Sequence, residues 1–343
     1  MPALAVADAL RAEGAQVLFI GGERAELELV PAAGYELRSL HVSPLARRAP
    51  AKAARAVAID AAAVGAACRL VRTLRPSAAL GAGGYVAGPV GLAAALVRVP
   101  LVLMEADSHL GLTNRLLAPL ARRVCLAFPL DGREGRRYIV TGRPVPAPAT
   151  DRAAARARFG LGSSETCVHV FGGSLGARSI NHAALEAFAG ARFRVLHAAG
   201  ERNLAQLQAP GPHYDLRGYI PRFGEALLAC DLVVARAGGS VFEIAAHGRP
   251  AVLVPYPHAT GDHQSANARY MEHAGAAAVI ADAELNGPRL ATEVGRLLAD
   301  PGRLAAMARA SAQMGRPDAA SEIARELLAL AGEGRSRQYG RLG

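Results

Sequence analysis

The feature that most constrains the fold is an alternation of short apolar segments with helical segments, which runs along the chain twice. The first series holds QVLFI, SAALGA, LVLME, RVCLAF and RYIVTG; the second holds CVHVFGG, FRVLHAAG, YDLRGYI, DLVVARAGG and AVLVPYP. Such alternation predicts parallel sheets covered by helices on both faces. The proline-rich segment TGRPVPAPATDRAAARARFGL between the series is typical of a linker. We therefore expect two α/β domains of similar size, with a cleft between them that suits a small molecule.

The first domain nevertheless opens on a helix. Leu4–Ala12 has a helical pattern that Gly14 ends, and a strand follows at Gln16–Ile20. A doubly wound domain normally begins with a strand and a glycine-rich turn, and its first helix comes only afterwards. The final helices are expected over residues 287–299, 301–314 and 319–331.

The charge of the chain restricts its partners. The net charge is +10, and residues 1–150 hold 18 basic against 11 acidic residues, so most of the excess lies in the first half. This excess favours nucleic acid, an anionic membrane surface or a merely solvated arginine-rich surface. Nucleic acid is the weakest of these, because there is no zinc-finger spacing and only 5% of the residues are aromatic.

Composition and spacing also disfavour a disulfide-linked protein, a metal-binding protein and a membrane-spanning protein. The four cysteines are widely separated and predict buried thiols in a reducing compartment, neither disulfides nor ligands. His258 and His263 have no third ligand at usable spacing, so no metal site is expected. The longest apolar stretch, Val86–Met104, is broken by glycine, arginine and proline, and predicts a helix and a strand, not a transmembrane span. No signal peptide is expected.

Three glycine-rich turns between a strand and a helix are candidate phosphate sites: GAGGYVAGP at Gly81–Pro89, FGGSLGARS at Phe171–Ser179 and RAGGSVFE at Arg236–Glu243. Glycine lets the backbone approach a ligand, and the helix that follows aims unpaired N–H groups at an anion. None matches the P-loop or the full dinucleotide fingerprint. One turn alone is weak evidence, but three of them favour a ligand with a diphosphate.

Two polar segments allow both a structural and a functional interpretation. Ser240 and Glu243 have the spacing of a capping box, which residue chemistry alone favours, although a carboxylate beside a glycine turn also suits ribose hydroxyls. GDHQSAN, Gly261–Asn267, predicts either a surface helix cap or hydrogen-bond partners for a sugar.

Together these segments resemble one family. The order GAGGYVAGP, a glutamate before GLTNR, GGSLGARSIN, RAGGSVFEIAAHGRPAVLVPYPHATGDHQSANA and a final helix is similar to the MurG family over nearly the whole chain. These are membrane-associated N-acetylglucosaminyltransferases of peptidoglycan synthesis. The resemblance implies an α/β GT-B fold, with two Rossmann-like domains whose parallel sheets face a cleft.

The implied activity is that of a hexosyltransferase. It moves N-acetylglucosamine from UDP-GlcNAc to the C4 hydroxyl of undecaprenyl-diphosphate-MurNAc-pentapeptide, inverting the anomeric centre without a metal or cofactor. The implied domains are an acceptor- and membrane-facing domain over 1–144, a UDP-GlcNAc-binding domain over 145–316 and a helix over 317–332 that packs back on the first domain. A disordered tail is expected over 333–343.

The resemblance also assigns the donor site residue by residue. Ser174 is expected to contact the donor diphosphate, and backbone atoms of Ile220 to read the uracil edge. Gly238, Gly239 and Ser240 are expected to cradle the phosphates. A departing UDP dianion with no metal needs helix N-termini of this kind to hold its charge.

The remaining assignments concern the sugars and the acceptor. Glu243 is expected to bind ribose and Gln264 the sugar hydroxyls, which reverses the preference for Glu243 as a cap only. Gly83, Gly84 and Tyr85 match a loop that faces the acceptor diphosphate. The arginine excess then fits docking at the cytoplasmic face of the cell membrane on anionic lipid, with cell-wall and division proteins as further partners and no nucleic acid.

The sequence departs from the family at its start. Met1–Ala7 aligns with the part that follows the family's first strand, first glycine loop and the histidine proposed as general base, so all three are missing. The missing strand would be central, and its loss should expose two strand edges. We expect Met1 to be an internal methionine of a longer protein. His109 is a substitute base only in principle, since a surface loop histidine is the better interpretation.

Two smaller departures fall near the acceptor. The family's H-E-Q-N reads Met104-Glu105-Ala106-Asp107, and its G-N-P-V-R reads Gly142-Arg143-Pro144-Val145-Pro146. Glu105, Asp107 and Arg143 are therefore secondary site candidates, with Arg143 or Arg152 as replacements for the lost arginine.

Two rival functions share this architecture. A UDP-GlcNAc 2-epimerase binds the same donor but needs no lipid acceptor. A chain without the N-terminal loop is alternatively a donor-binding protein with impaired catalysis.

Overall fold

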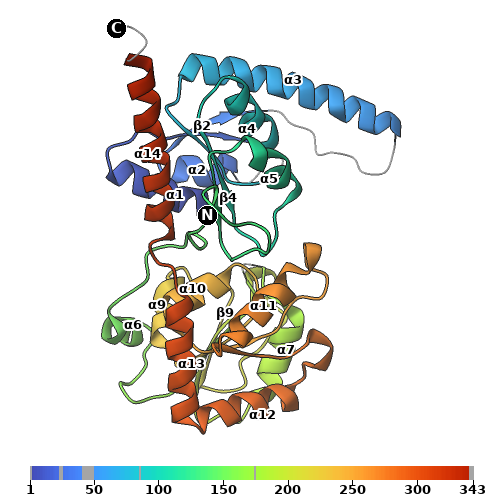
Figure 1. Cartoon of the computed structure of the whole chain (residues 1–343). Coiled ribbons are helices and arrows are strands. Elements are labelled where there is room, and N and C mark those ends of the chain that lie inside the picture. Colours follow the sequence, from blue (N-terminus) through green and yellow to red (C-terminus); the bar gives the residue numbers. More distant parts are fainter. Residues whose placement is uncertain (1, 23–25, 41–49, 85, 174, 340–343) are drawn as a thin grey trace. The chain divides into compact units, whose positions relative to one another are not determined.

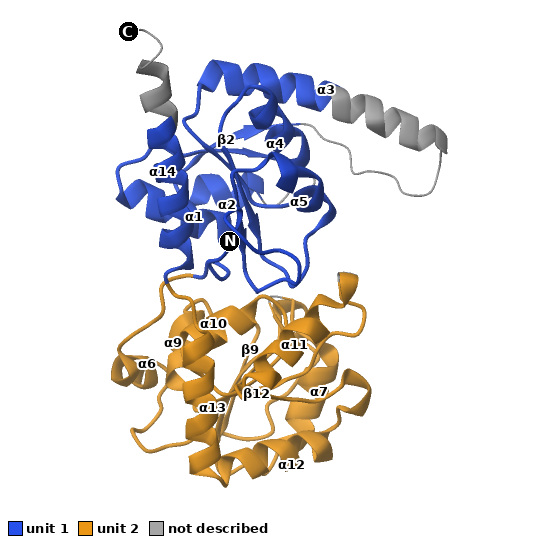
Figure 2. Cartoon of the chain, viewed as in Figure 1, with its two compact units in different colours: residues 1–145, 318–343 blue, residues 146–317 orange. Residues whose placement is uncertain are grey.

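The computed structural model of the chain (Figure 1) describes residues 2–22, 26–40, 50–84, 86–173 and 175–339, with side chains except those of residues 50–61, 260 and 334–339. The chain divides into two compact units, coloured separately in Figure 2. Unit 1 comprises Met1–Val145 and Asp318–Gly343, and unit 2 comprises Pro146–Pro317. Every strand pairing in the described residues is parallel, as the alternating pattern predicts.

Unit 1 alternates strands and helices and closes with the last helix of the chain. Its strands are β1 (Leu18–Gly21), β2 (Glu36–Ser39), β3 (Ala79–Gly81), β4 (Leu101–Glu105), β5 (Arg123–Leu126) and β6 (Tyr138–Val140). Its helices are α1 (Pro2–Ala12), α2 (Glu26–Ala32), α3 (Pro50–Leu74), α4 (Ala87–Leu96), α5 (Leu112–Leu117), the 3₁₀ turn η1 (Ala118–Leu120) and α14 (Ala319–Tyr339).

The sheet of unit 1 is interrupted. β1 pairs only with β2, while β3, β4, β5 and β6 form a separate sheet in that order. Helix α1 covers both: Val6 packs in one cluster with Val102 and Met104 of β4, and Ala7 packs in another with Tyr35 beside β2. No described strand lies between β1 and β3, so each has one edge that pairs with no described strand, which agrees with the expected exposure of two strand edges.

Helix α14 lies beside α1 in unit 1 (Figure 1). Ile323, Leu327 and Leu330 bury their side chains against the β4 and β5 cluster. The helix continues to Tyr339, whereas the sequence predicts a disordered tail from residue 333. That expectation is wrong for residues 333–339, because the two glycines, Gly332 and Gly334, cost a helix only about 1 kcal/mol each, and the arginines and glutamine that follow them favour it. Residues 340–343 lie outside the described residues.

Unit 2 has one continuous sheet of order β12-β11-β10-β7-β8-β9. The strands are β7 (Cys167–Phe171), β8 (Arg194–Ala198), β9 (Tyr214–Arg217), β10 (Leu232–Ala235), β11 (Ala251–Leu253) and β12 (Ala277–Val279). The helices are α6 (Arg152–Arg158), α7 (Arg178–Ala187), α8 (Glu201–Leu204), α9 (Phe223–Ala229), α10 (Ser240–Ala246), α11 (His263–His273), α12 (Gly287–Leu298) and α13 (Pro301–Met314), with 3₁₀ turns η2 (Thr260–Asp262) and η3 (Asp282–Glu284).

The two faces of this sheet explain why its strands are apolar throughout. Along β7, Cys167 and Phe171 pack in one buried cluster, and Val168 and Val170 pack in another. Because β7 also pairs with β8 on one edge and β10 on the other, it is buried on every side. Its loops at the carboxyl end are thereby held on a rigid base.

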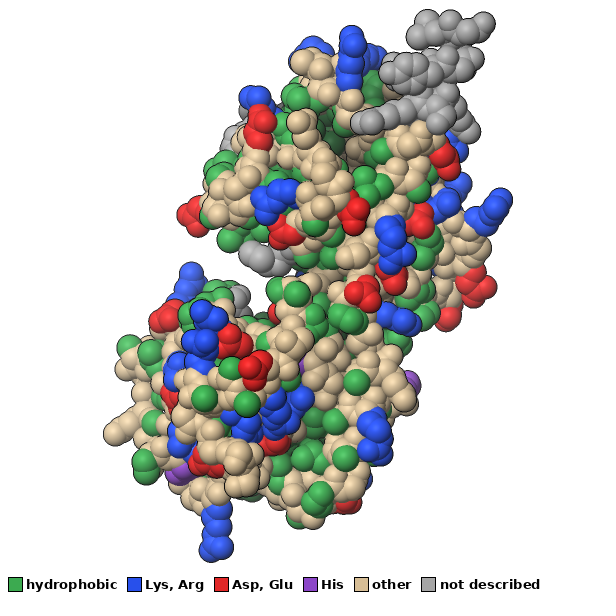
Figure 3. All heavy atoms as spheres, turned by 90° about the vertical axis from the view of Figure 1, so that its left-hand side faces the viewer, with side chains coloured by type: hydrophobic (Ala, Val, Ile, Leu, Met, Phe, Trp, Pro, Cys, Tyr) green, Lys and Arg blue, Asp and Glu red, His purple; other side chains and the backbone are tan. Residues whose placement is uncertain are grey.

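The structure also bears on the predictions about the cysteines, membrane-spanning helices and surface charge. The four cysteines are free; Cys125, Cys167 and Cys230 are buried, and burial raises the pKa of Cys125 and Cys230 to about 12. Among the described residues, no helix is both long and apolar enough to cross a membrane. On the face of the molecule drawn in Figure 3, basic and acidic side chains are interspersed.

Candidate functional site

The turn that follows β10 offers three adjacent main-chain donors. Ala235 ends the strand and Ser240 begins α10. The N–H groups of Gly238, Gly239 and Ser240, and the Ser240 hydroxyl, make no hydrogen bond with any described residue. All three residues are partly exposed. Donors that a strand and a helix hold in this way, with no partner of their own, suit an anion.

Two side chains of α11 lie beside this turn, and one of them bonds to it. The Asn267 side-chain amide donates to the carbonyl of Ala237 at 2.9 Å and is 2% exposed. Gln264 accepts a bond from the Tyr256 N–H at 3.0 Å through Oε1. Its amide nitrogen lies 3.7 Å from where a β-carbon on Gly238 would stand. The structure thus brings Gln264 beside Gly238, two residues that the sequence analysis had placed in one site.

The second glycine turn of unit 2 joins β7 to α7. Gly173 and Gly176 have φ values of +92° and +73°. A β-carbon on Gly176 would lie 1.9 Å from the Ala199 carbonyl oxygen, so this glycine is required by close backbone packing. Ser174, the predicted diphosphate contact, lies outside the described residues.

Ile220 follows β9 at the same carboxyl edge of the sheet. Its side chain is 2% exposed and packs in the cluster that contains Phe171 and Leu227. Its backbone N–H and C=O form no hydrogen bond within the described part of the chain. A fixed residue with open main-chain groups is suited to reading the polar edge of a base.

The capping-box interpretation of Ser240 and Glu243 is wrong. Gly239 occupies the N-cap position, Ser240 already lies inside α10, and no side chain caps the helix. The glycine before Ser240 allows the helix to begin one residue earlier than the motif requires. Glu243 is half-buried in the first turn. Asp262 likewise makes no capping bond to α11, because its backbone is left-handed with φ of 54°.

A neutral histidine fixes the far end of α10. His247 Nε2 accepts the Ala149 N–H at 3.2 Å, and Nδ1 lies 2.7 Å from the Glu243 carbonyl oxygen. Burial lowers the pKa of His247, although the Glu243 carbonyl opposes the shift. A neutral ring protonated on Nδ1 satisfies both contacts, so the imidazole ties α10 to the start of unit 2.

Sequence analysis missed the role of Arg236, which is the first residue of the RAGGS turn. It is 8% exposed, and its guanidinium forms an ion pair with Asp282 at 2.6 Å. The available signal was an arginine directly after an apolar strand. That position predicts a buried guanidinium, and a buried guanidinium needs a carboxylate partner. The partner cannot be chosen from sequence because Asp282 lies in η3, beyond five further elements (α10, β11, η2, α11 and β12).

The glycine turn of unit 1 follows β3. Gly83 and Gly84 have φ values of +87° and +79°, and no atom of the described residues would lie within 4 Å of a β-carbon on either. Thr113 donates to the Gly84 carbonyl at 3.2 Å, which joins the turn to α5. The turn is therefore open to a ligand. Tyr85 lies outside the described residues.

Glu105 organises the loop after β4. Its carboxylate accepts the N–H groups of Asp107 at 3.2 Å and Gly111 at 2.9 Å, and the side-chain amide of Asn114 at 2.9 Å. The side chain is 6% exposed. Three bonds engage the carboxylate within the protein, so its evident role is to fix this loop.

Asp107 and Arg143, the two departures from the family pattern, lie together. Arg143 Nη1 donates to the Ala106 carbonyl at 3.2 Å and lies 4.0 Å from Asp107 Oδ1. Arg152, the other candidate for the lost arginine, instead pairs with Asp231 at 2.5 Å in unit 2. His109 is exposed and forms no bond to a described residue.

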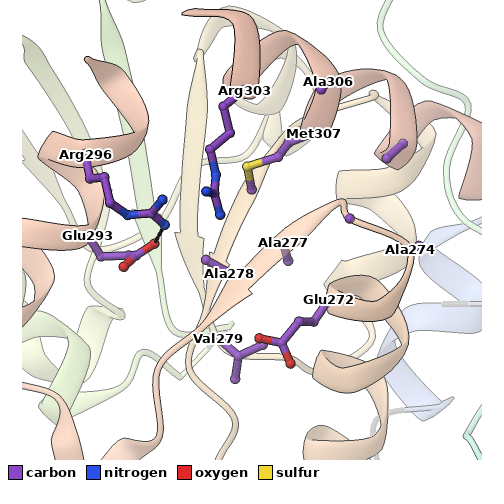
Figure 4. Close-up of a pocket in the computed structure, with 12 residues that line it drawn as sticks. Glu272, Ala274, Ala277, Ala278, Val279, Glu293, Arg296, Arg303, Ala306 and Met307 are labelled. Atoms are coloured by element: carbon purple, nitrogen blue, oxygen red, sulfur yellow. Dashed lines mark hydrogen bonds and ion pairs between the residues drawn. The ribbon is translucent and has the colours of Figure 1, made fainter. Parts of the chain in front are cut away.

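A cavity of about 630 Å³ lies elsewhere in unit 2, beside edge strand β12 (Figure 4). Its lining includes Glu293, Arg296, Arg303 and Met307 but none of the predicted site residues. Glu293 and Arg296 form an ion pair with each other. Burial alone would raise the pKa of Glu293, yet its bonds to Arg296 and Arg289 hold that pKa below the usual value. Across the described residues, no cluster of three His, Cys, Asp or Glu side chains could hold a metal.

Comparisons with known proteins match this architecture from end to end. The glycosyltransferase family 28 N-terminal domain matches residues 1–126, and its C-terminal domain matches residues 167–323. A UDP-N-acetylglucosamine–N-acetylmuramyl-(pentapeptide) pyrophosphoryl-undecaprenol N-acetylglucosamine transferase of Moorella thermoacetica is 42% identical, over 95% of this chain and 94% of its own length.

Comparison with solved structures finds the same two-domain architecture. The crystal structure of Acinetobacter baumannii MurG has a TM-score of 0.78 and 28% identity, covering 96% of this chain and 95% of its own. The calicheamicin glycosyltransferase CalG4 has a TM-score of 0.67 at 19% identity over 96% and 94% of the two chains, which concerns the fold alone. The expected GT-B fold of two Rossmann-like domains with parallel sheets is confirmed.

Proposed function

The chain belongs to the MurG family of UDP-N-acetylglucosamine–N-acetylmuramyl-(pentapeptide) pyrophosphoryl-undecaprenol N-acetylglucosamine transferases, and on this premise we propose how it acts. It is a hexosyltransferase. The proposed reaction moves N-acetylglucosamine from UDP-GlcNAc to the C4 hydroxyl of undecaprenyl-diphosphate-MurNAc-pentapeptide. The observation that carries this proposal is the RAGGS turn of unit 2, whose three unpartnered N–H groups suit the diphosphate of the donor.

In the proposed donor site, Gly238, Gly239 and Ser240 bind the phosphate oxygens, and Ser174 does so from the neighbouring turn. Gln264 is supported as a sugar contact because its amide nitrogen lies against Gly238. The Ile220 backbone is supported as a uracil contact by its open polar groups.

Glu243 completes the proposed donor site as the ribose ligand. Its support is that it lies in the first turn of α10, beside the phosphate turn. A carboxylate near a glycine-rich turn accepts a hydrogen bond from a ribose hydroxyl in dinucleotide sites.

The proposed transfer is an inverting displacement. The acceptor C4 oxygen attacks the anomeric carbon from the face opposite UDP. The new C–O bond forms as the bond to the phosphate oxygen breaks; the electron pair leaves with UDP, and the hydroxyl proton passes to a base. Main-chain donors aimed at the phosphate stabilise the growing negative charge, so the proposed step needs no metal. We assign the base to none of the described residues.

The proposed acceptor is linked to a membrane lipid, so the enzyme needs a surface that binds the membrane. Exposed leucines and arginines of unit 1 are candidates for that surface. Four leucines of α4, α5 and η1 are exposed: Leu96 by 61%, Leu112 by 43%, Leu116 by 66% and Leu120 by 49%. The exposed arginines nearest to them in sequence are Arg98, Arg115 and Arg122, and no carboxylate of the described residues pairs with these three.

Apolar side chains flanked by cations favour peripheral binding to anionic lipid. We propose that this surface docks the enzyme on the cytoplasmic face of the membrane, where a lipid-linked acceptor is found. Gly83 and Gly84 are the proposed contacts for the acceptor diphosphate, because their turn is open and is joined to α5 through Thr113.

The test is UDP release from UDP-GlcNAc, measured with and without the lipid acceptor and with and without EDTA. The proposal predicts release that requires the acceptor and is unaffected by the chelator. Formation of UDP-N-acetylmannosamine without acceptor would identify an epimerase instead. Donor binding with no release under any condition would identify a binding protein, and loss of activity in EDTA would contradict the metal-free step.

A further inference from the structure

The Arg236 side chain contacts residues from several loops of unit 2. It follows β10, and its Nη1 donates to the carbonyl oxygens of Val254 at 3.2 Å and Pro255 at 3.3 Å, just after β11. Its guanidinium carbon lies 5.4 Å from the ring centre of Tyr256. The Tyr256 N–H in turn donates to Gln264 of α11.

Two further partners complete a closed triangle. Arg236 Nη2 donates to Ser179 Oγ at 2.8 Å, Ser179 Oγ donates to Asp282 Oδ1 at 2.8 Å, and Asp282 pairs with Arg236 at 2.6 Å. Ser179 is the last residue of the FGGSLGARS segment and lies in the first turn of α7. Asp282 begins η3, after β12.

The triangle is shielded from water, which strengthens it. The Arg236 side chain is 10% exposed and that of Asp282 is 23% exposed. Hydrogen bonds between charged groups in such a setting are shorter and stronger than neutral ones. Removing one partner leaves the other charge buried without compensation, so the contacts resist local opening of the loops.

We infer that Arg236 is a positioning residue: together with Ser179 and Asp282 it holds the RAGGS turn and the FGGSLGARS turn at the fixed separation that one diphosphate requires. This inference rests on the proposed function, since it takes the donor diphosphate as the shared ligand. Main-chain donors act well only when they are already in place before the ligand arrives. The guanidinium itself is neutralised by Asp282 and does not contact the ligand.

The test compares Ser179→Ala, Ser179→Thr and Asp282→Asn in the full chain, with UDP as the probe. Ser179→Ala removes two sides of the triangle, whereas Ser179→Thr keeps the hydroxyl. Arg289→Gln is the matched control, because it breaks an arginine–glutamate pair of α12 at 3.2 Å that lies outside the site. Affinity is measured by calorimetry, and amide hydrogen exchange over residues 237–242 is measured without ligand.

We expect Ser179→Ala and Asp282→Asn to raise the Kd for UDP about tenfold and to speed exchange at residues 237–242, with Ser179→Thr and Arg289→Gln close to the wild type. Wild-type affinity and exchange in both Ser179→Ala and Asp282→Asn would overturn the inference, as would weaker binding with unchanged exchange. A wild-type protein that fails to bind UDP would instead contradict the proposed function, and the exchange measurement would still decide whether the triangle holds the turn.

Discussion

Glycine has two different roles in the turns of unit 2. At Gly176 the backbone packs so closely on Ala199 that no side chain fits, and φ is +73°. At Gly238 φ is not in the left-handed region, and the nearest described atom to a β-carbon is the side-chain amide nitrogen of Gln264 at 3.7 Å. The protein therefore tolerates a methyl group at Gly238, and what the glycine leaves open is space for a ligand.

We predict that Gly238→Ala keeps the thermal stability of the wild type but weakens UDP binding about tenfold, which corresponds to roughly 1.4 kcal/mol. Gly176→Ala is the contrasting variant and should lower the melting temperature, because backbone atoms would have to move. Thermal unfolding and calorimetry with UDP measure both effects. Unchanged UDP affinity in a folded Gly238→Ala protein would argue against phosphate binding at this turn.

At the residue scale, the glycine turns and their helices could be predicted because their signal is local. The residues that hold them could not. Asn267 and Arg236 act through contacts with Ala237 and Asp282 that only the packed sheet brings together. The bonds of Glu105 also depend on the path of the loop that follows it.

At the scale of single elements, β7 and β8 carry two buried histidines. His169 Nδ1 lies 2.8 Å from the Leu196 carbonyl oxygen, and its other ring nitrogen has no partner among the described residues. His197 lies 2.7 Å from the Tyr214 hydroxyl and 3.1 Å from Asn181 Oδ1. Burial lowers the pKa of His169 to about 4, against a small opposing effect of Leu196, and lowers that of His197 to about 3.

These shifts predict that unit 2 loses stability as the pH falls. Unfolded histidine takes up a proton near pH 6.5, whereas these folded rings stay neutral until about 4 and about 3. Below pH 6.5 the unfolded state therefore binds more protons, and each histidine lowers the free energy of unfolding by about 1.4 kcal/mol per pH unit. Urea unfolding over this range should show a smaller pH slope in His197→Gln, and an equal slope would contradict the prediction.

Strand prediction succeeded for long apolar segments rich in β-branched or leucine side chains, and it failed for a polar strand and for a short alanine-rich one. β4 has the predicted bounds, Leu101–Glu105, because both faces of its sheet are covered. β2, Glu36–Ser39, is polar and largely exposed, and β12, Ala277–Val279, is short and alanine-rich. β2 has none of the β-branched or aromatic side chains that usually indicate a strand, and β12 has only Val279.

At the scale of the whole molecule, the two units differ in the continuity of their sheets. In unit 2, β7 joins the two halves of a six-stranded sheet, whereas in unit 1 no described strand joins β1 to β3. The sequence indicated this difference because its first predicted element is a helix, with no strand before it. The residues that span the interruption, Val6 and Ala7 of α1, could be seen only in the folded chain.

We predict that amides of β1 and β3 exchange hydrogen faster than those of β4 in the same unit and of β7 in unit 2. Each of the first two strands has an unpaired edge, while β4 and β7 are paired on both sides. Hydrogen exchange with mass spectrometry resolves the four segments. Equal protection of β1, β3 and β4 would show that the interruption does not weaken the unit.

The measurement that tests the central claim most directly is analysis of the lipid product after incubation with UDP-GlcNAc and undecaprenyl-diphosphate-MurNAc-pentapeptide. The account predicts that mass spectrometry finds one added N-acetylhexosamine on the acceptor, and that NMR finds it β-linked to C4 of the muramyl unit. Gly238→Ala should form the same product more slowly at low donor concentration. An unmodified acceptor, or an α-linked sugar, would contradict the account.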